Sequence, residues 1–320
     1  MENKTTLEAL DEKQSWPLDK KITHALKRIQ EFYAFMDGKV YVAFSGGKDS
    51  TVLLHLVRSL YPEAIAVFSN TTNEFVEILE FIKKVDNVVE VKPKMTFNET
   101  VKKFGFPLVS KKVSRQIKDI KHPTGNNEAT RRLYLTGIKT DGTMSRDFKL
   151  AKKWHPLITA DFELTSQCCD ILKKEPMHRY EKESKRKPFV GTMADESGSR
   201  KMSYIKTGCN SFEKGKIMSK PMSIWTEADV WEYIERFDVP YSKIYDPVYD
   251  EEGNVVIEGE KRTGCAYCAY GAHLEKSSLT EKNRFERLKL RKPKQYKKIM
   301  ALQNNGVTFT EALSFIKVNH

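Results

Sequence analysis

The 320-residue sequence lacks any long apolar run. No stretch approaches the roughly 18 to 20 consecutive apolar residues that a transmembrane helix needs. The start of the chain, Met1-Glu2-Asn3-Lys4, also lacks the apolar segment of a signal peptide. We therefore expect no membrane partner and a cytoplasmic location.

Cysteine is scarce as well. The chain has five cysteines, an odd number, and is long enough to fold around a hydrophobic core without crosslinks. This count argues against a disulfide framework and leaves thiol chemistry or metal binding as the expected uses.

Acidic residues are outnumbered, because 55 Lys and Arg against 43 Asp and Glu give a formal charge of +12. Such an excess attracts phosphate-rich ligands of any size, from a nucleotide to a nucleic acid. Lys-rich helices that face solvent would explain the same excess, so the charge alone does not identify the partner.

Apolar segments alternate with amphipathic ones after an initial helix expected at residues 24–36. We expect strands at 39–44, 64–69 and 87–91, and helices at 50–60 and 73–84. Strands that alternate with helices predict an α/β fold with a twisted, mainly parallel sheet and right-handed crossovers. Further along, we expect a strand near 188–191, a helix after the capping-box pair Thr226 and Asp229, one short strand within 250–259, and a helical, basic end.

A glycine-containing loop follows the first predicted strand: Ser45-Gly46-Gly47-Lys48-Asp49-Ser50. Two glycines let the backbone approach an oxyanion closely, and the helix that follows begins with amides and a dipole that favour negative charge. The spacing fits neither G-x-x-x-x-G-K-[ST] nor G-x-G-x-x-G. We interpret the loop as a phosphate-binding site, and an ordinary tight turn is the alternative.

The cysteines form two pairs and one single residue: Cys168-Cys169, Cys265-x-x-Cys268 and Cys209. Four paired thiolates suit an iron–sulfur cluster or a zinc ion. The two pairs are far apart in the sequence, so they share one site only if the fold brings them together. Unrelated buried thiols are the remaining alternative.

The S-G-G-x-D-S loop resembles that of the PP-loop superfamily of adenine-nucleotide α-hydrolase-like enzymes, which includes ATP pyrophosphatases, thiolation enzymes and phosphoadenosine-phosphosulfate (PAPS) reductases. The resemblance implies that residues 45–50 hold the phosphates of ATP, adenylylsulfate (APS) or PAPS, with catalytic roles for Lys48 and Asp49 and an Mg²⁺ ion near Asp49. Asn70, at the end of the second predicted strand, lies in a segment similar to the one that meets the adenine. We accordingly divide the chain into an N-terminal helical segment (1–38), a PP-loop nucleotide-binding domain (39–225) and a helical, cysteine-bearing C-terminal region (226–320).

The cysteine pairs and their flanks resemble the CC…CxxC pattern of the APS reductases. The stretch CCDILKKEP is similar to the family's CC-x-x-x-K-x-x-P, and GTMADESGSR to its G-x-R-x-x-E-S…R segment around the phosphates. The resemblance implies that a [4Fe–4S] cluster binds to Cys168, Cys169, Cys265 and Cys268. It also implies nucleotide contacts from Gly191, Glu196, Ser197 and Arg200.

Two features depart from this pattern. Met193 stands where the family usually carries Arg, which removes a bidentate anion contact. The reductases also end in E-C-G-L-H with a nucleophilic cysteine, whereas this sequence has no cysteine after Cys268. Because the thiol route to sulfite needs a thiolate, Cys209 becomes the candidate nucleophile. A buried thiol and a cluster ligand are the alternatives for Cys209.

We therefore expect a PAPS reductase family enzyme of sulfur metabolism or sulfur transfer, a sulfonucleotide reductase-like oxidoreductase that works with a sulfur donor or reductant protein. The alternative is an ATP-pyrophosphatase sulfurtransferase that modifies tRNA or DNA, which the loop, the missing terminal cysteine and the basic surface favour. A second alternative is a nucleic-acid-binding regulator with a degenerate nucleotide site. The oligomeric state is left open.

Overall fold

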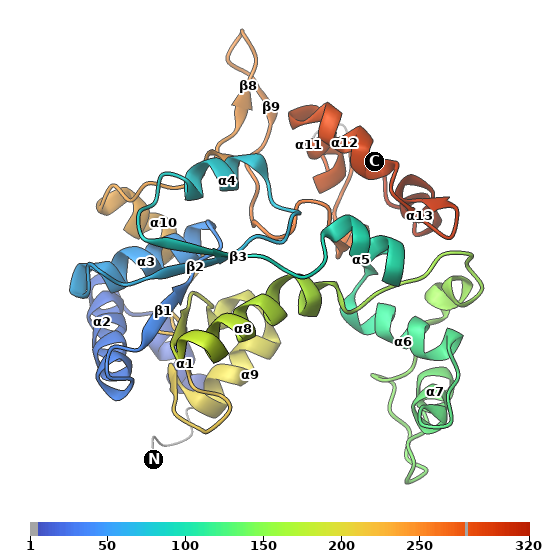
Figure 1. Ribbon diagram of the computed structural model, residues 1–320, viewed down its shortest axis with the longest axis horizontal. Helices are drawn as coiled ribbons and strands as arrows, with labels where there is room; N and C mark the ends of the chain where they lie inside the picture. The colour runs from blue at the N-terminus through green and yellow to red at the C-terminus, as the bar shows by residue number, and fades with distance from the viewer. Residues whose placement is uncertain (1–5, 279–280) are drawn as a thin grey trace.

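A six-stranded sheet forms the centre of the protein in the computed structural model, which describes residues 6–278 and 281–320 (Figure 1). The strand order is β3-β2-β1-β5-β7-β6, and every neighbouring pair is parallel except β6 and β7. The predicted α/β fold with a mainly parallel sheet is therefore confirmed. The strands are β1 (Val40–Ala43), β2 (Ala66–Ser69), β3 (Val88–Val91), β5 (Lys187–Val190), β6 (Asn210–Ser211) and β7 (Met218–Ser219).

Helices cover both faces of this sheet. Neighbouring residues of β1 show this, because their side chains point to opposite faces and each contacts different helices. Val42 joins a core with α2 (Leu18–Phe35), α3 (Lys48–Leu60) and α10 (Glu227–Arg236), whereas the ring of Tyr41 contacts Tyr180 of α8 (Glu175–Ser184) at a centroid distance of 5.2 Å. The predicted capping box of α10 is present: Asp229 accepts a hydrogen bond from the Thr226 amide at 2.6 Å. The core around Val42 also contains residues of α1 (Leu7–Gln14), α4 (Val76–Ile82) and α9 (Gly198–Thr207).

A second hydrophobic core joins two segments that are distant in the sequence, and it lies beside the sheet (Figure 1). Phe106 stacks on Phe309 at 5.2 Å, and the short strand β4 (Leu108–Val109) pairs in parallel with β10 (Ala269–Tyr270). The first segment supplies α5 (Phe97–Phe104), α6 (Lys111–Lys121) and α7 (Glu128–Thr136), and the second supplies α11 (Arg284–Arg291), α12 (Pro293–Met300) and α13 (Phe309–Phe315). The division of the chain at residues 38 and 225 stays a prediction.

Three elements differ from their predicted bounds. The first helix begins at Leu18, before residue 24, because Pro17 suits a helix start. Helix α4 is shorter than 73–84, because the Asn73 side chain contacts a distant segment instead and accepts from the Tyr267 amide at 3.1 Å. A hairpin of β11 (Gln303–Asn304) and β12 (Val307–Thr308) interrupts the helical end.

The one short strand predicted within 250–259 is confirmed as β9 (Val255–Ile257). It pairs with β8 (Val248–Tyr249), which lies just before that range and was not predicted.

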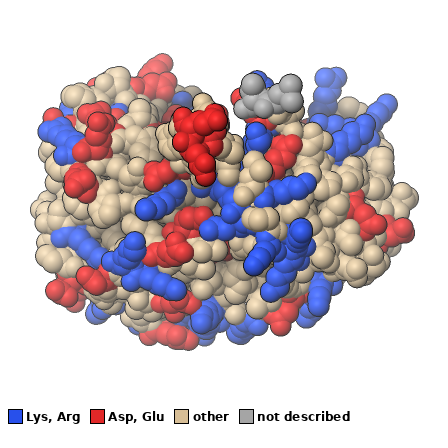
Figure 2. All heavy atoms as spheres, turned by 90° about the horizontal axis from the view of Figure 1, so that it is seen from above, with Lys and Arg blue, Asp and Glu red and all other residues tan. Residues whose placement is uncertain are grey.

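Charge on the surface is mixed. Figure 2 shows Lys and Arg side chains spread across the upper face, with Asp and Glu side chains between them. This mixture is typical of solvent-facing helices. Within the described ranges, no helix is long and apolar enough to cross a bilayer, and residues 1–4, which lack a signal-like segment, lie outside those ranges.

Candidate active site

The loop at residues 45–50 comprises the turn that follows β1 and the first three residues of α3, and its own hydroxyl groups hold it in shape. Ser50 Oγ donates to the Gly47 carbonyl at 2.9 Å and lies 3.1 Å from Ser45 Oγ. Gly46 has φ +71°, and a Cβ there would lie 2.9 Å from a methyl of Ile78. The loop therefore needs glycine at this position for both its backbone conformation and its packing.

Lys48 and Asp49 open α3 and are largely buried. Lys48 Nζ lies 3.0 Å from Glu227 Oε1 and donates to the Lys261 carbonyl at 3.2 Å. Asp49 Oδ1 is buried without a hydrogen-bond partner among the described residues, and Lys48 Nζ stands 3.7 Å away. Burial raises the pKa of Asp49, and Glu227 raises it further against the opposing charge of Lys48. A buried carboxylate oxygen with unused lone pairs is chemically suited to bind a hard cation such as Mg²⁺.

The segment after β5 packs directly against this loop. A Cβ at Gly191 would lie 3.0 Å from the Asp49 carbonyl oxygen, so the glycine permits close approach of the two backbones. Glu196 accepts from the Met193 amide at 2.9 Å and forms an ion pair with Arg200. Ser197 Oγ accepts from the Arg200 amide at 3.4 Å and caps α9. These contacts orient Arg200 toward the loop.

One cavity of about 1090 Å³ joins the loop to the cysteines. Of the predicted site residues it is lined by Ser45, Gly47, Lys48, Asp49, Ser50, Gly191, Glu196, Arg200, Cys169, Cys265 and Cys268. The other five predicted residues, Gly46, Asn70, Cys168, Ser197 and Cys209, do not line it. Asn70 instead accepts from the Thr72 amide at 3.0 Å and donates to Glu90 at 3.2 Å.

Three of the four paired cysteines line this cavity, and the fourth, Cys168, is buried near them. Burial raises the pKa of Cys168, and the charges of the other three paired cysteines raise it further, which requires that all four lie near one another. Burial likewise raises the pKa of Cys268 to about 11. Among the residues that the structure describes, no three His, Cys, Asp or Glu side chains are arranged to hold a single metal ion. A [4Fe–4S] cluster is larger than one ion, so its four thiolates stand further apart, and four converging thiols are the donor set that such a cluster uses.

Lys173 is a site residue that the sequence analysis did not single out. Burial opposes its charge, but the negative charges of Cys265, Glu74 and Cys169 outweigh burial and raise the pKa of Lys173. The ammonium group therefore stays protonated beside the thiols, on the wall of the cavity. Its place in the CC-x-x-x-K stretch was the available signal.

A segment before Cys265, residues 258–264, covers the loop, and we call it the strap. A Cβ at Gly47 would lie 2.5 Å from Thr263 Oγ1, and the Tyr245 hydroxyl bridges the two segments. That hydroxyl accepts from the Lys48 amide at 3.0 Å and lies 2.8 Å from Thr263 Oγ1. No local motif marked Tyr245 or the strap, because their contacts with the loop are long-range.

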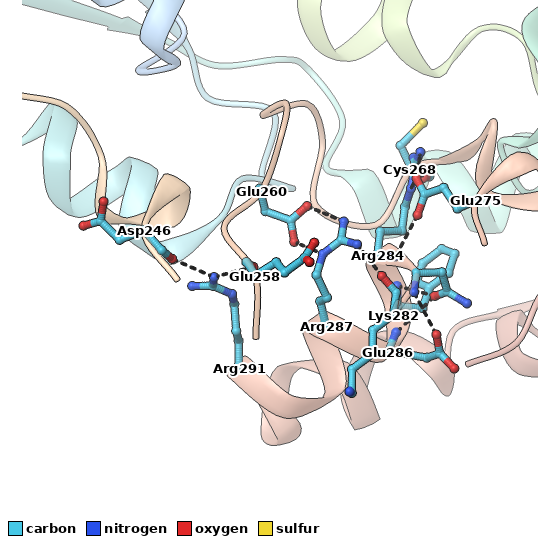
Figure 3. A network of polar contacts seen from close by, with 12 residues as sticks. Asp246, Glu258, Glu260, Cys268, Glu275, Lys282, Arg284, Glu286, Arg287 and Arg291 are labelled. Carbon is cyan, nitrogen blue, oxygen red and sulfur yellow. Dashed lines mark hydrogen bonds and ion pairs between the residues drawn. The ribbon is translucent and has the colours of Figure 1, made fainter. Parts of the chain in front are cut away.

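Helix α11 fixes the strap and the CxxC segment through three arginines (Figure 3). Arg284 donates to the carbonyls of Cys268, at 2.7 Å, and Tyr270, at 3.1 Å. Arg287 binds both carboxylate oxygens of Glu260, at 2.7 and 2.6 Å. Arg291 donates to the carbonyls of Asp246 and Glu258, both at 3.0 Å. The strap and the CxxC segment are thus braced by the same helix.

Cys209 lies apart from the paired cysteines. It is 4% exposed and belongs to the core around the main sheet, whereas Cys168 belongs to the second core. Burial lowers the pKa of the neighbouring Lys220, and the charge of Cys209 opposes that shift. This placement favours packing as the role of Cys209, and its catalytic role stays a prediction.

Comparisons with known proteins agree with one another. The sequence model of the phosphoadenosine phosphosulfate reductase domain matches residues 39–138 and 126–257. The adenosine 5'-phosphosulfate reductase of Bacillus cereus strain 03BB102 is 24% identical over 236 residues, which cover 72% of this chain and 77% of that protein. An uncharacterized protein of Methanocaldococcus jannaschii is 25% identical over 81% of this chain, but the match spans only 48% of that relative, about half its length.

A distant structural likeness accompanies these matches. The crystal structure of phosphoadenylyl-sulfate reductase from Candida auris, a phosphate complex, aligns with a TM-score of 0.40 and 16% identity over 78% of this chain and 98% of that one. The sequence matches give no support to a nucleic-acid partner and do not favour the sulfurtransferase or regulator alternatives.

Proposed function

Because the chain belongs to the phosphoadenosine phosphosulfate reductase domain family, we propose that it is a sulfonucleotide reductase-type oxidoreductase that binds an adenylated sulfate, APS or PAPS, in the cavity between the loop and the cysteines. The observation that carries the proposal is this cavity, which is lined both by Ser45, Gly47, Lys48 and Ser50 of the loop and by Cys169, Cys265 and Cys268. A substrate whose nucleotide phosphate and sulfur atom need different chemical environments fits such a site.

The loop and its neighbours would bind the nucleotide. Ser45 and Ser50 offer hydroxyl donors, the backbone at Gly46 and Gly47 allows close approach, and Lys48 and Arg200 balance the phosphate charge. Gly191 keeps the second segment close, while Glu196 and Ser197 orient Arg200. Asp49 would bind Mg²⁺ where the nucleotide needs one, and Asn70 would help to form the adenine end of the site.

The paired cysteines, Cys168, Cys169, Cys265 and Cys268, would hold a [4Fe–4S] cluster. When bound, the cluster would supply a redox-active, electron-accepting group next to the substrate. Lys173 keeps its proton at Nζ because of the surrounding negative charge, so it would present a fixed positive charge to the sulfate oxygens.

The reaction would reduce the sulfate of the substrate to sulfite. The bond between sulfur and the bridging oxygen breaks, AMP or its 3'-phosphorylated form leaves, and a dithiol reductant protein supplies two electrons and becomes a disulfide. Lys48 and Arg200 would stabilise the negative charge that gathers on the leaving phosphate.

The test uses anaerobically purified protein with a dithiol reductant and, in separate reactions, APS, PAPS or ATP. We expect sulfite and AMP, or its 3'-phosphorylated form, from one sulfonucleotide and no pyrophosphate from ATP. Lys48→Met should lower turnover about 10²- to 10³-fold. The matched control Lys39→Met, an exposed lysine outside the cavity, should leave it unchanged. Pyrophosphate release from ATP without sulfite formation would refute the reductase and support the sulfurtransferase alternative.

A further inference from the structure

Four arginines line the cavity, and they differ in their partners. Arg200 pairs with Glu196, Arg284 with Glu275, and Arg287 with Glu260. In the described part of the chain, no carboxylate forms an ion pair with Arg262. A guanidinium without a carboxylate partner beside a cavity is well suited to bind an anion, because its donors match an oxyanion in a bidentate manner.

The strap fixes the backbone of Arg262 from both sides. Glu260, only 6% exposed, is bound by Arg287, which anchors the strap two residues before Arg262. On either side of Arg262, the Lys261 carbonyl accepts from Lys48 Nζ and Thr263 Oγ1 contacts the Tyr245 hydroxyl. The two neighbours of Arg262, Lys261 and Thr263, therefore both lie against the loop.

Arg262 and Arg200 line the same cavity, together with Lys48 and Asp49 of the loop. After burial, the charge of Arg262 is the next cause of the lowered pKa of Arg200, so the two guanidinium groups lie close enough to repel each other. Two guanidinium groups that repel each other at one cavity wall create a position where an anion is favoured. Met193, which is buried and uncharged, adds no cation there.

We propose that Arg262, together with Arg200, binds the anionic group that is joined through an anhydride bond to the 5'-phosphate of the nucleotide. This inference rests on the proposed function. The group is sulfate in APS and PAPS and pyrophosphate in ATP, and AMP lacks it. Arg262 is thereby a specificity-determining residue, which favours the anhydride-bearing nucleotide over the AMP that remains after the reaction.

The test measures the affinities of AMP, APS and ATP by isothermal titration calorimetry with the holoprotein. Arg262→Met should weaken the binding of an anhydride-bearing nucleotide about 10- to 100-fold, and change AMP affinity less than about threefold. Arg262→Lys should fall between Arg262→Met and the wild type, because Lys keeps the charge but not the bidentate geometry. Arg146→Met, which removes an exposed arginine outside the cavity, is the matched control and should leave all three affinities unchanged.

The outcomes separate the inference from the proposed function. Whichever of APS and ATP loses affinity identifies whether sulfate or pyrophosphate occupies the position. Equal weakening of AMP and the anhydride-bearing nucleotides, or no weakening of any, overturns the inference but does not contradict the proposed function. Wild-type protein that binds none of the three, and does not bind PAPS either, refutes the proposed function and the inference together. Because Arg262 is exposed, thermal unfolding should be the same for both variants and the wild type.

Discussion

The ion pair between Glu260 and Arg287 is expected to contribute strongly to the stability of the strap. The Glu260 side chain is 6% exposed and that of Arg287 17% exposed, and two short hydrogen bonds join them. Burial would lower the pKa of Arg287, but the Glu260 carboxylate outweighs it and raises that pKa. Glu260→Gln removes the charge and leaves a buried guanidinium without its counter-ion.

The expected cost is about 3 kcal/mol, at the lower end of the range for breaking a buried pair, because Arg287 keeps some access to water. In a chain of this size that loss lowers the melting temperature by roughly 6 °C. A double-mutant cycle with Arg287→Met should give a coupling energy of about 2 kcal/mol, since the second substitution removes the stranded charge.

Thermal and urea unfolding, followed by circular dichroism, measure these quantities. The matched control is Lys289→Met, which removes one exposed charge from the same helix and should change the melting temperature by less than about 2 °C. A Glu260→Gln variant that unfolds like the wild type would show that the Glu260–Arg287 pair does not stabilise the protein.

Three further predictions concern the cysteines and the loop. Anaerobically purified protein should be brown and contain about four irons per chain, and Cys268→Ser should lose most of that iron. One zinc per chain would contradict this prediction. Cys209→Ser should keep both iron and turnover because the thiol is buried away from the cavity, whereas loss of turnover with iron retained would identify Cys209 as the nucleophile. Asp49→Asn should raise the melting temperature at neutral pH: the raised pKa means that the folded wild type binds this proton more tightly than the unfolded chain, so its stability falls as pH rises through the folded pKa. A variant whose stability has the same pH profile as the wild type would contradict that account.

Local sequence patterns predicted the parts of the fold that depend on neighbouring residues. The loop at 45–50 follows a strand and leads into a helix, as expected. The capping box forms because Thr226 and Asp229 are only three residues apart in the sequence. Helix α4 was predicted too long, because Asn73 is engaged by Tyr267 from a distant part of the chain. A local pattern carries no information about such a contact.

In the candidate site, too, local motifs were predictable and long-range contacts were not. The S-G-G-x-D-S loop and the cysteine pairs are visible in the sequence, and the structure brings most of them to one cavity. Tyr245 and the strap were not predicted, because Tyr245 reaches the Lys48 amide across 197 positions of sequence. Arg262 carries no motif of its own, and its relation to the loop appears only once the strap is folded over it.

The pairing of β4 with β10 has a consequence for how the protein is made. Strand β4, which belongs to the same hydrophobic core as Cys168, finds its partner strand only next to Cys268, in a segment that the ribosome synthesises much later. At ordinary translation rates the second cysteine pair emerges on the order of 5 to 20 seconds after the first. During that interval the main sheet from β1 to β7 can already form, while the first two thiols remain without the other pair. If the four paired cysteines hold a cluster together, its full set of ligands is available only after translation is nearly complete.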